Sequence, residues 1–282
     1  MRIIEAEDEL RTAVSAARAA EKRIGFVPTM GALHQGHLSL VSAAKRECDL
    51  VAVSIFINPT QFGPNEDYDK YPRTLNEDTK LLAGEDVDLV FTPARETIYP
   101  EGCSTWVEVE GLLTRTLEAA QRPEHFRGVT TVVAKLFQLV APDVAYFGRK
   151  DFQQSVVIRR MTHDLCYPID IQVCETIRDP DGLALSSRNQ YLNEKQRQQA
   201  LSLSKGLFAA RAMFEHGERH GDALHVAVQA VFDEYADVSV DYIAIVDPET
   251  LEPLETVVDR CAVLIAARVG QTRLIDNLML EN

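Results

Sequence analysis

Two histidines three residues apart, His34 and His37, close a short turn between an apolar run and a periodic apolar segment. The run ends at Pro28, Gly31 breaks the turn, and residues 38–48 have a helical pattern. This order predicts strand, turn and helix, with both imidazoles on one face of the helix entrance. Unpaired N–H groups and the helix dipole favour anions there. We therefore expect a small, dry, positive pocket suited to an anion such as phosphate, the alternative being a turn with two incidental histidines.

A second cluster, Gly148 to Gln154, also follows an apolar strand pattern and opens a helix. Lys150 offers a point charge to a phosphate group. Asp151 has two interpretations, because it could contact a ligand or cap the helix. Gln154 lies about one turn further on, and it either faces the ligand or lies on the solvated surface.

A third cluster, Ser186, Ser187 and Arg188, places two hydroxyls and a guanidinium on the polar loop 178–189. These groups can donate to phosphate oxygens, although the same tripeptide is common in ordinary loops.

Neutral amides form a further group, in which Asn58 and Gln61 share a loop rich in proline and glycine. An amide both donates and accepts hydrogen bonds, so it suits a substrate with hydroxyl groups. A glutamine can also orient a carboxylate without the tight ion pair that would weaken it as a nucleophile. Gln61 and Gln154 are the candidates for this task.

Other site classes fit the sequence less well. His34 and His37 could ligate a metal, but no third ligand stands at a recognisable spacing. The sequence contains no G-x-S-x-G elbow, no P-loop pattern G-x-x-x-x-G-K-[ST] and no G-x-G-x-x-G fingerprint. A serine hydrolase, a P-loop protein and a dinucleotide-binding protein are therefore not indicated.

The elements that must position these residues alternate between strand and helix in the first part of the chain. The apolar runs predict strands at 23–28, 50–57, 89–91, 105–109, 144–147 and 169–174. The periodic segments predict helices at 38–48, 75–83, 128–140 and 152–165. Such alternation favours a parallel sheet wrapped by helices, with ligands beyond the carboxyl ends of the strands. The loops 28–37, 58–64 and 148–151 would then meet at one edge.

The pattern changes near Thr176. Helices are predicted at 194–216 and 221–235, and strands at 240–246, 261–269 and 272–278. We therefore expect an α/β domain over residues 1–176 and a smaller α+β domain over residues 177–282 that covers the active site.

Composition restricts the class of protein. The net charge of −14 over 282 residues argues against nucleic-acid and anionic-membrane partners, while local cations can still hold a small anion. No apolar run is long enough to span a membrane, and the acidic start does not resemble a signal peptide. Five widely spaced cysteines favour reduced thiols and a cytoplasmic location.

At the level of motifs, residues 34–37 resemble the His-x-Gly-His turn of a nucleotidyltransferase superfamily that includes class I aminoacyl-tRNA synthetases. Over essentially its full length the chain resembles the pantothenate synthetase (pantoate–β-alanine ligase) family. Six segments in the family's order carry this resemblance: residues 28–37, 54–62, 71–74, 122–129, 150–154 and 185–189. The resemblance implies a Rossmann-like sheet with a smaller α+β C-terminal domain.

The resemblance also implies an activity, the ATP-dependent condensation of (R)-pantoate with β-alanine through a pantoyl adenylate. It implies a Mg²⁺-dependent cytoplasmic homodimer in which the element matching His37 acts as an acid. The catalytic residues would be His34, His37, Lys150, Ser186, Ser187 and Arg188. ATP would contact Met30, Gly31, Ala32, Leu33, His34, Gln35, Gly36, His37, Gly148, Arg149, Lys150, Asp151, Ile177, Leu185, Ser186, Ser187 and Arg188. Pantoate and β-alanine would contact Asn58, Gln61 and Gln154.

Two points stay open. Asp78 is a candidate Mg²⁺ ligand, although an acidic residue in the first turn of a helix has a simpler explanation in the helix dipole. The alternatives for function are another nucleotidyltransferase that releases a nucleotide ester, and a nucleotide-sensing module without turnover. A tRNA synthetase fragment is disfavoured by the acidic charge.

Overall fold

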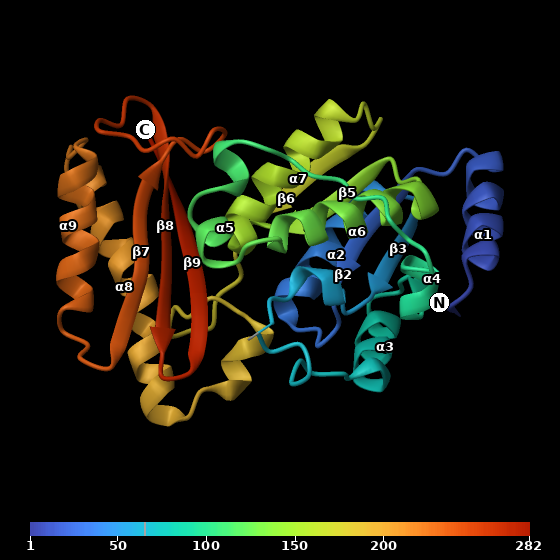
Figure 1. Cartoon of the computed structure of the whole chain (residues 1–282), viewed down its shortest axis with the longest axis horizontal. Coiled ribbons are helices and arrows are strands. Elements are labelled where there is room, and N and C mark those ends of the chain that lie inside the picture. Colours follow the sequence, from blue (N-terminus) through green and yellow to red (C-terminus); the bar gives the residue numbers. More distant parts are fainter. Residues whose placement is uncertain (65) are drawn as a thin grey trace.

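The computed structural model describes residues 1–64 and 66–282, and its larger sheet has six parallel strands (Figure 1). Their order across the sheet is β1-β4-β3-β2-β5-β6. The strands are β1 (Arg2–Ile4), β2 (Ile24–Thr29), β3 (Leu50–Ile55), β4 (Leu89–Phe91), β5 (Val144–Gly148) and β6 (Asp170–Cys174). Strand β3 lies on one side of β2, and the later strand β5 lies on the other side, so the strand order reverses at β2. Loops that leave β2 and β5 therefore diverge, which opens a crevice at this switch point.

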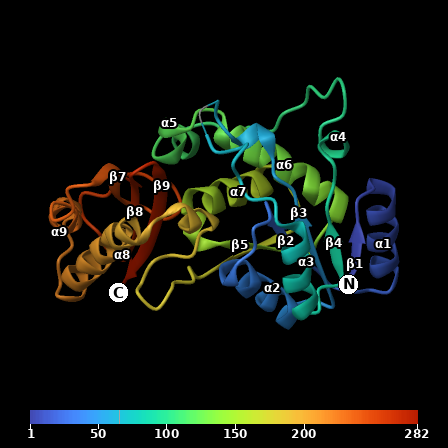
Figure 2. The same cartoon turned by 90° about the horizontal axis from the view of Figure 1, so that it is seen from below.

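Helices cover both faces of this sheet, as Figure 2 shows. The helices on one face are α1 (Glu7–Ala19), α6 (His125–Val140) and α7 (Phe152–Asp164). Those on the opposite face are α2 (Gln35–Glu47) and α3 (Leu75–Gly84). Strand β3 shows how the sequence specifies these layers. Leu50 and Ala52 pack toward α6, whereas Val51 and Val53 pack toward α2, because successive side chains of a strand point to opposite faces.

The C-terminal part forms a three-stranded antiparallel sheet, in the order β7-β8-β9. Its strands are β7 (Val238–Val246), β8 (Arg260–Val269) and β9 (Thr272–Glu281), and its helices are α8 (Glu194–Glu215) and α9 (Gly221–Phe232). In β8, Val263 and Ile265 pack on the two helices, while Ala262 and Leu264 pack on the side of α7. The small sheet is thus covered on one face by its own helices and on the other by the first part of the chain.

The predicted α/β fold with a smaller α+β part is confirmed. The boundary between residues 176 and 177 lies between β6 and α8 and stays a prediction. Two details differ from the sequence analysis. The predicted strand at 105–109 is wrong, because this segment has no strand partner among the described residues. Strand β1 and helix α1, which the sequence analysis did not propose, form the edge of the sheet and part of its cover.

Several short elements complete the described chain. They are η1 (Pro59–Gln61), α4 (Arg95–Ile98), η2 (Leu112–Thr114), α5 (Glu118–Gln121), η3 (Arg149–Asp151) and η4 (Ser187–Tyr191). Three of these, η1, η3 and η4, carry predicted site residues. Over residues 1–64 and 66–282, none of the helices combines the length and the apolar character that crossing a bilayer requires.

Candidate active site

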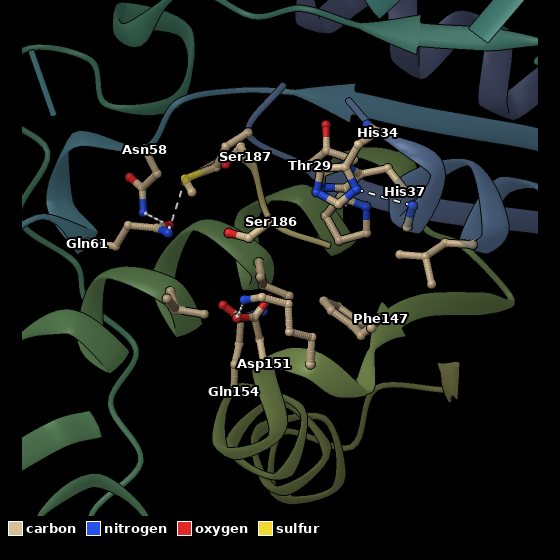
Figure 3. A pocket seen from close by; sticks show the side chains of 18 of the residues that line it. Thr29, His34, His37, Asn58, Gln61, Phe147, Asp151, Gln154, Ser186 and Ser187 are labelled. Atoms are coloured by element: carbon tan, nitrogen blue, oxygen red, sulfur yellow. Dashed lines mark hydrogen bonds and ion pairs between the residues drawn. The ribbon is translucent and has the colours of Figure 1, made fainter. Parts of the chain in front are cut away.

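The loops after β2, β3 and β5 meet in one cavity at the switch point of the larger sheet (Figure 3). The predicted residues that line it are Met30, His34, Gly36, His37, Asn58, Gln61, Gly148, Lys150, Asp151, Gln154, Ile177, Leu185, Ser186, Ser187 and Arg188. Those outside its lining are Gly31, Ala32, Leu33, Gln35, Asp78 and Arg149. Segments far apart in the sequence are thus gathered at the edge where the fold favours a ligand. Their individual roles stay predictions.

The two histidine side chains accept hydrogen bonds from backbone N–H groups in the first turn of α2. His34 is the N-cap residue, and its Nδ1 accepts a hydrogen bond from the Gly36 N–H at 3.1 Å. The Nδ1 of His37 accepts from the His34 N–H at 3.3 Å. Each Nδ1 is therefore an acceptor, which leaves the proton of the neutral ring on Nε2. The two rings lie 4.2 Å apart, centroid to centroid, and each Nε2–H can donate to a ligand.

Burial and neighbouring cations keep both imidazoles neutral. Burial, followed by the charge of Lys150, lowers the pKa of His34 to about 4. Burial, followed by the closeness of His34, lowers the pKa of His37 to about 3. In the ligand-free site the two rings therefore add no positive charge of their own. Positive charge at this edge comes from Lys150 and the N-terminus of α2, and the imidazoles supply neutral N–H donors.

Gly36 makes this folded-back turn possible. A Cβ at this position would lie 2.8 Å from Cε1 and 2.9 Å from Nδ1 of His34. Any side chain would therefore push the ring away from its capping position. This contact explains in physical terms why a glycine separates the two histidines.

Asp78 supports the same turn from behind. Its Oδ2 and Oδ1 accept the N–H groups of Ala32 and Leu33, at 3.0 Å and 2.8 Å. The Thr74 hydroxyl lies 3.3 Å from both oxygens, and Asp78 is only 2% exposed. Asp78 is therefore an anchor for the backbone of residues 32–33, and its geometry does not fit the proposed Mg²⁺ ligand. Among the described residues, no group of three or more His, Cys, Asp and Glu side chains is arranged for a metal.

Lys150 lies in η3, immediately before α7, and lines the same cavity as the histidines. Its Nζ is 3.3 Å from Oδ1 of Asp151. Asp151 occupies the N-cap position of α7, but its side chain makes no capping hydrogen bond, so the capping interpretation does not hold. Arg149 points elsewhere, to an ion pair with Glu175. Gln154 lines the cavity from α7, which answers the question of where its amide faces (Figure 3).

The Ser186–Arg188 segment reaches the cavity from the other side. The Ser187 hydroxyl lies 3.3 Å from the Tyr71 hydroxyl. Arg188 makes a bidentate ion pair with Asp67, through Nε at 3.0 Å and Nη2 at 2.8 Å. These two contacts hold the segment to the loop between β3 and α3. Sequence reasoning did not single out Asp67, and it gave Tyr71 no role, although Tyr71 begins one of the family-like segments.

The amide pair rests on helix α6. Asn58 Nδ2 donates to Gln61 Oε1 at 3.0 Å and to the Gly128 carbonyl at 3.1 Å. A Cβ on Gly128 would lie 2.3 Å from the Thr60 carbonyl oxygen, so the loop and the helix can approach this closely only at glycine. Gln61 Nε2 also lies 3.2 Å from Met30 Sδ. Figure 3 shows this pair on one side of the cavity and the two histidines on the other.

The cavity also has walls that sequence reasoning missed. Helix α6 supplies an apolar wall of Val129, Val132, Val133 and Leu136. Arg122 and His125 line the cavity near the amides, and the His125 Nδ1 lies 2.8 Å from the Gln61 carbonyl. Arg122 is paired with Glu66 at 2.6 Å. The family-like segment 122–129 was the available signal, because the wall and both polar residues lie in it or in the next two turns of α6.

Comparisons with known proteins agree with this geometry. Residues 2–279 match the family described as Pantoate-beta-alanine ligase. A pantothenate synthetase of Moorella thermoacetica is 51% identical over 281 residues, covering 100% of this chain and 99% of the relative. The crystal structure of pantothenate synthetase from Thermus thermophilus superposes with a TM-score of 0.95 at 47% identity, covering 99% of both chains. The Francisella tularensis pantoate-beta-alanine ligase, complexed with beta-gamma ATP and beta-alanine, gives 0.80 at 35% identity, covering 99% of this chain and 97% of that one.

Proposed function

The chain belongs to the pantoate-beta-alanine ligase family, and from this premise we propose how its cavity joins the two substrates. The protein is a ligase that condenses pantoate with β-alanine, as its relatives' names and full-length similarity support. The detailed proposal rests on a single observation. The imidazoles of residues 34 and 37, the Lys150 ammonium and the Ser186–Arg188 segment all line one cavity with neutral amides opposite.

ATP is proposed to lie across the turn of residues 34–37. The two Nε2–H groups would donate to the triphosphate at the positive end of the α2 dipole, and Lys150 would supply a full positive charge. A bound triphosphate would raise the pKa values of both histidines, since a nearby anion favours the protonated ring. A protonated His37 could then donate its proton, which reconciles the neutral ligand-free ring with the acid role implied by the resemblance.

Pantoate is proposed to lie between the amides and the apolar wall of α6. Gln61 and Gln154 can hydrogen-bond its hydroxyls and carboxylate, while the valines of the wall suit its two methyl groups. Neutral amides leave the carboxylate charged and nucleophilic. Arg122, the nearest guanidinium on this side, is already paired with Glu66.

The reaction then proceeds in two displacements. A pantoate carboxylate oxygen attacks the α-phosphorus of ATP, and pyrophosphate leaves with the electrons of the broken P–O bond. The neutral amine of β-alanine attacks the acyl carbon of the adenylate, loses a proton and expels AMP. The chain's own residues contribute alignment and charge stabilisation, so no side chain becomes covalently attached. Because the geometry of Asp78 does not fit Mg²⁺, we derive no step through a protein-held metal.

The test is isotope exchange between pyrophosphate and ATP. We expect exchange that requires pantoate, followed by AMP release and amide formation when β-alanine is added. Exchange without pantoate would favour another nucleotidyltransferase. ATP binding without any exchange would favour a nucleotide-sensing module and overturn the proposal.

We also propose that the chain forms a homodimer through the segment 104–110. Trp106 is 44% exposed, and the main-chain groups of Trp106 and Glu108 have no backbone hydrogen bond among the described residues. An extended, strand-like segment with free edges can pair with its copy. Light scattering should give a dimer mass, and Trp106→Glu should shift it toward the monomer. A monomeric wild-type protein at micromolar concentration would contradict the proposal.

The cytoplasmic location stays a prediction.

A further inference from the structure

Two adjacent residues of the C-terminal sheet, Asp276 and Asn277 on strand β9, contact segments that lead into the cavity, the turn of Lys150 and the loop before Ser186. Each is only 3% exposed. The Asn277 amide nitrogen donates to the Arg149 carbonyl at 2.8 Å and to the Lys150 carbonyl at 2.9 Å. Two consecutive carbonyls of the turn that carries the Lys150 ammonium are thus held by one side chain from the other sheet.

Asp276 holds the second phosphate-facing segment through Arg178. The Arg178 guanidinium donates to Asp276 Oδ2 at 2.6 Å and to Oδ1 at 2.9 Å. Arg178 lies at the base of a narrow loop, because Leu185 N–H donates to the Ile177 carbonyl at 2.9 Å and Arg178 pairs with Ala184. This loop leads directly into Ser186. The position of the Leu185–Arg188 segment therefore depends on the same dipeptide.

The hydrogen bonding of Asn277 argues for orientation more than for stability. Within the described residues, its buried Oδ1 has no hydrogen-bond partner. A buried acceptor without a partner reduces the net stabilisation that the side chain provides. The packing of α7 on Ala262 and Leu264 already joins the two parts of the molecule through apolar contacts. To this apolar contact the amide adds two directed hydrogen bonds, which fix the direction of the 149–151 turn.

We propose that Asn277 and Asp276 are positioning residues for adenylate formation, Asn277 through the Lys150 turn and Asp276 through Arg178 and the Leu185–Arg188 segment. The C-terminal sheet is then part of the nucleotide site and not only a cover over it. The inference rests on the proposed function, in which Lys150 and the Ser186–Arg188 segment bind the triphosphate. A failure of this inference can be distinguished from a failure of the proposed function, because pantoate-dependent exchange by the wild-type protein tests that function separately.

The first experiment compares Asn277→Ala with Asn282→Ala. Asn282 is an exposed residue beyond the end of β9 that donates to the Val258 carbonyl and accepts from Arg219, so it is a control of the same residue type that does not line the cavity. We expect Asn277→Ala to lower kcat for pantoate-dependent exchange about 10- to 100-fold, because a small misplacement of a charged group has effects of that size. The KM for pantoate should change less than about 3-fold, since Gln61 and Gln154 are untouched. Asn282→Ala should match the wild type.

The second experiment asks whether Asn277 acts through Lys150. ATP affinity is measured by calorimetry for Asn277→Ala in the wild-type background and in a Lys150→Ala background. We expect Asn277→Ala to lower ATP affinity about 10-fold in the wild-type background and less than about 2-fold in the Lys150→Ala background. In the second background the ammonium that Asn277 positions is already absent. Equal losses in both backgrounds would assign Asn277 a merely structural role and overturn the proposal. Wild-type exchange kinetics in Asn277→Ala would also overturn it.

A third variant keeps the test decisive if Asn277→Ala does not fold. Arg178→Lys retains the charge beside Asp276 but cannot make the bidentate pair. We expect it to fold with a lower thermal unfolding temperature than the wild type, and to raise the KM for ATP about 5- to 10-fold while the KM for pantoate is unchanged. An unchanged KM for ATP in this variant would contradict the role assigned to Asp276.

Discussion

The turn of residues 34–37 and the segment of residues 186–188 face the same cavity, but they are held in different ways. In the turn, backbone N–H groups donate to the two imidazole Nδ1 atoms and to the buried carboxylate of Asp78 on α3. The segment is held by side chains of a distant loop, through Tyr71 and Asp67. These hydrogen bonds use backbone N–H groups and leave both Nε2–H groups free for a ligand, whereas an ion pair at the segment can be exchanged or shared. The site therefore has a preorganised half and an adjustable half.

The largest effects should come from the donors fixed on rigid elements. We expect His37→Ala and Lys150→Ala each to lower kcat for exchange about 10²- to 10³-fold, the usual cost of removing one donor aimed at developing charge. His163→Ala is the control, because His163 is 83% exposed on α7. Circular dichroism should show an intact fold in all three. Near-normal turnover in either variant would remove that residue from the site.

Gly36→Ala tests whether the turn is rigid. The added methyl group would lie 2.8 Å from the His34 ring, so the cap must open, and we expect a loss of about 10²-fold in kcat. Gly84→Ala is a matched control in which a methyl group meets no atom within 4 Å. If Gly36→Ala kept wild-type kinetics, the turn would be adjustable and the contrast between the two halves would be lost.

The pH dependence of stability separates the halves in another way. The pKa of His37 is lowered to about 3, so below pH 6.5 the unfolded chain takes up a proton that the folded chain does not. The stabilisation that the folded chain gains from a neutral His37 is complete above pH 6.5 and is lost as the pH falls toward 3. At pH 5 the free energy of unfolding is lower by about 2 kcal/mol for this reason. Burial raises the pKa of Asp67, but Arg188 lowers it by more, so this pKa lies below its ordinary value. Asp67 therefore stays charged at pH 5, and the stability of the other half does not change there.

The measurement is the free energy of unfolding in denaturant at pH 7 and pH 5. The wild type should lose about 2 kcal/mol more than His37→Gln between these values, because the variant has no titrating ring at this position. Parallel losses in the two proteins would mean that His37 is not buried in its neutral form.

The same contrast explains what the sequence could predict. The turn of residues 34–37 is contiguous with its strand and helix, so its type, its place and its two histidines were readable from local pattern. The partner of Arg188 is 121 residues away, and no local pattern identifies Asp67 among the chain's many acidic residues. The neutral state of His37 was equally hidden, since it depends on burial and on the neighbouring ring.

The fold shows a similar limit. Strands buried on both faces, such as β3, were predicted from continuous apolar runs. Residues 105–109 have the composition of a strand, but pairing requires a partner, and the described chain offers none. Helix α1 was predictable in principle, because its buried residues Leu10, Val14 and Ala17 follow the helical period.

The smallest expected effect concerns the adjustable half. Asp67 uses the Nε and Nη2 edge of Arg188, which leaves Nη1 and the second Nη2 proton for a phosphate oxygen. Asp67 therefore orients the guanidinium without blocking it. We expect Asp67→Asn to raise the KM for ATP about 10-fold and to change kcat less, because a segment held by side chains can still adjust around the bound triphosphate.

Asp69→Asn is the matched control, since Asp69 is an exposed residue of the same loop and the variant loses the same charge. Both variants remove one negative charge, so any general attraction for ATP cancels between them. Tighter ATP binding in Asp67→Asn alone would mean that Asp67 competes with the triphosphate for Arg188. The Asp67–Arg188 ion pair would then inhibit ATP binding, because it would have to break before the phosphates could bind.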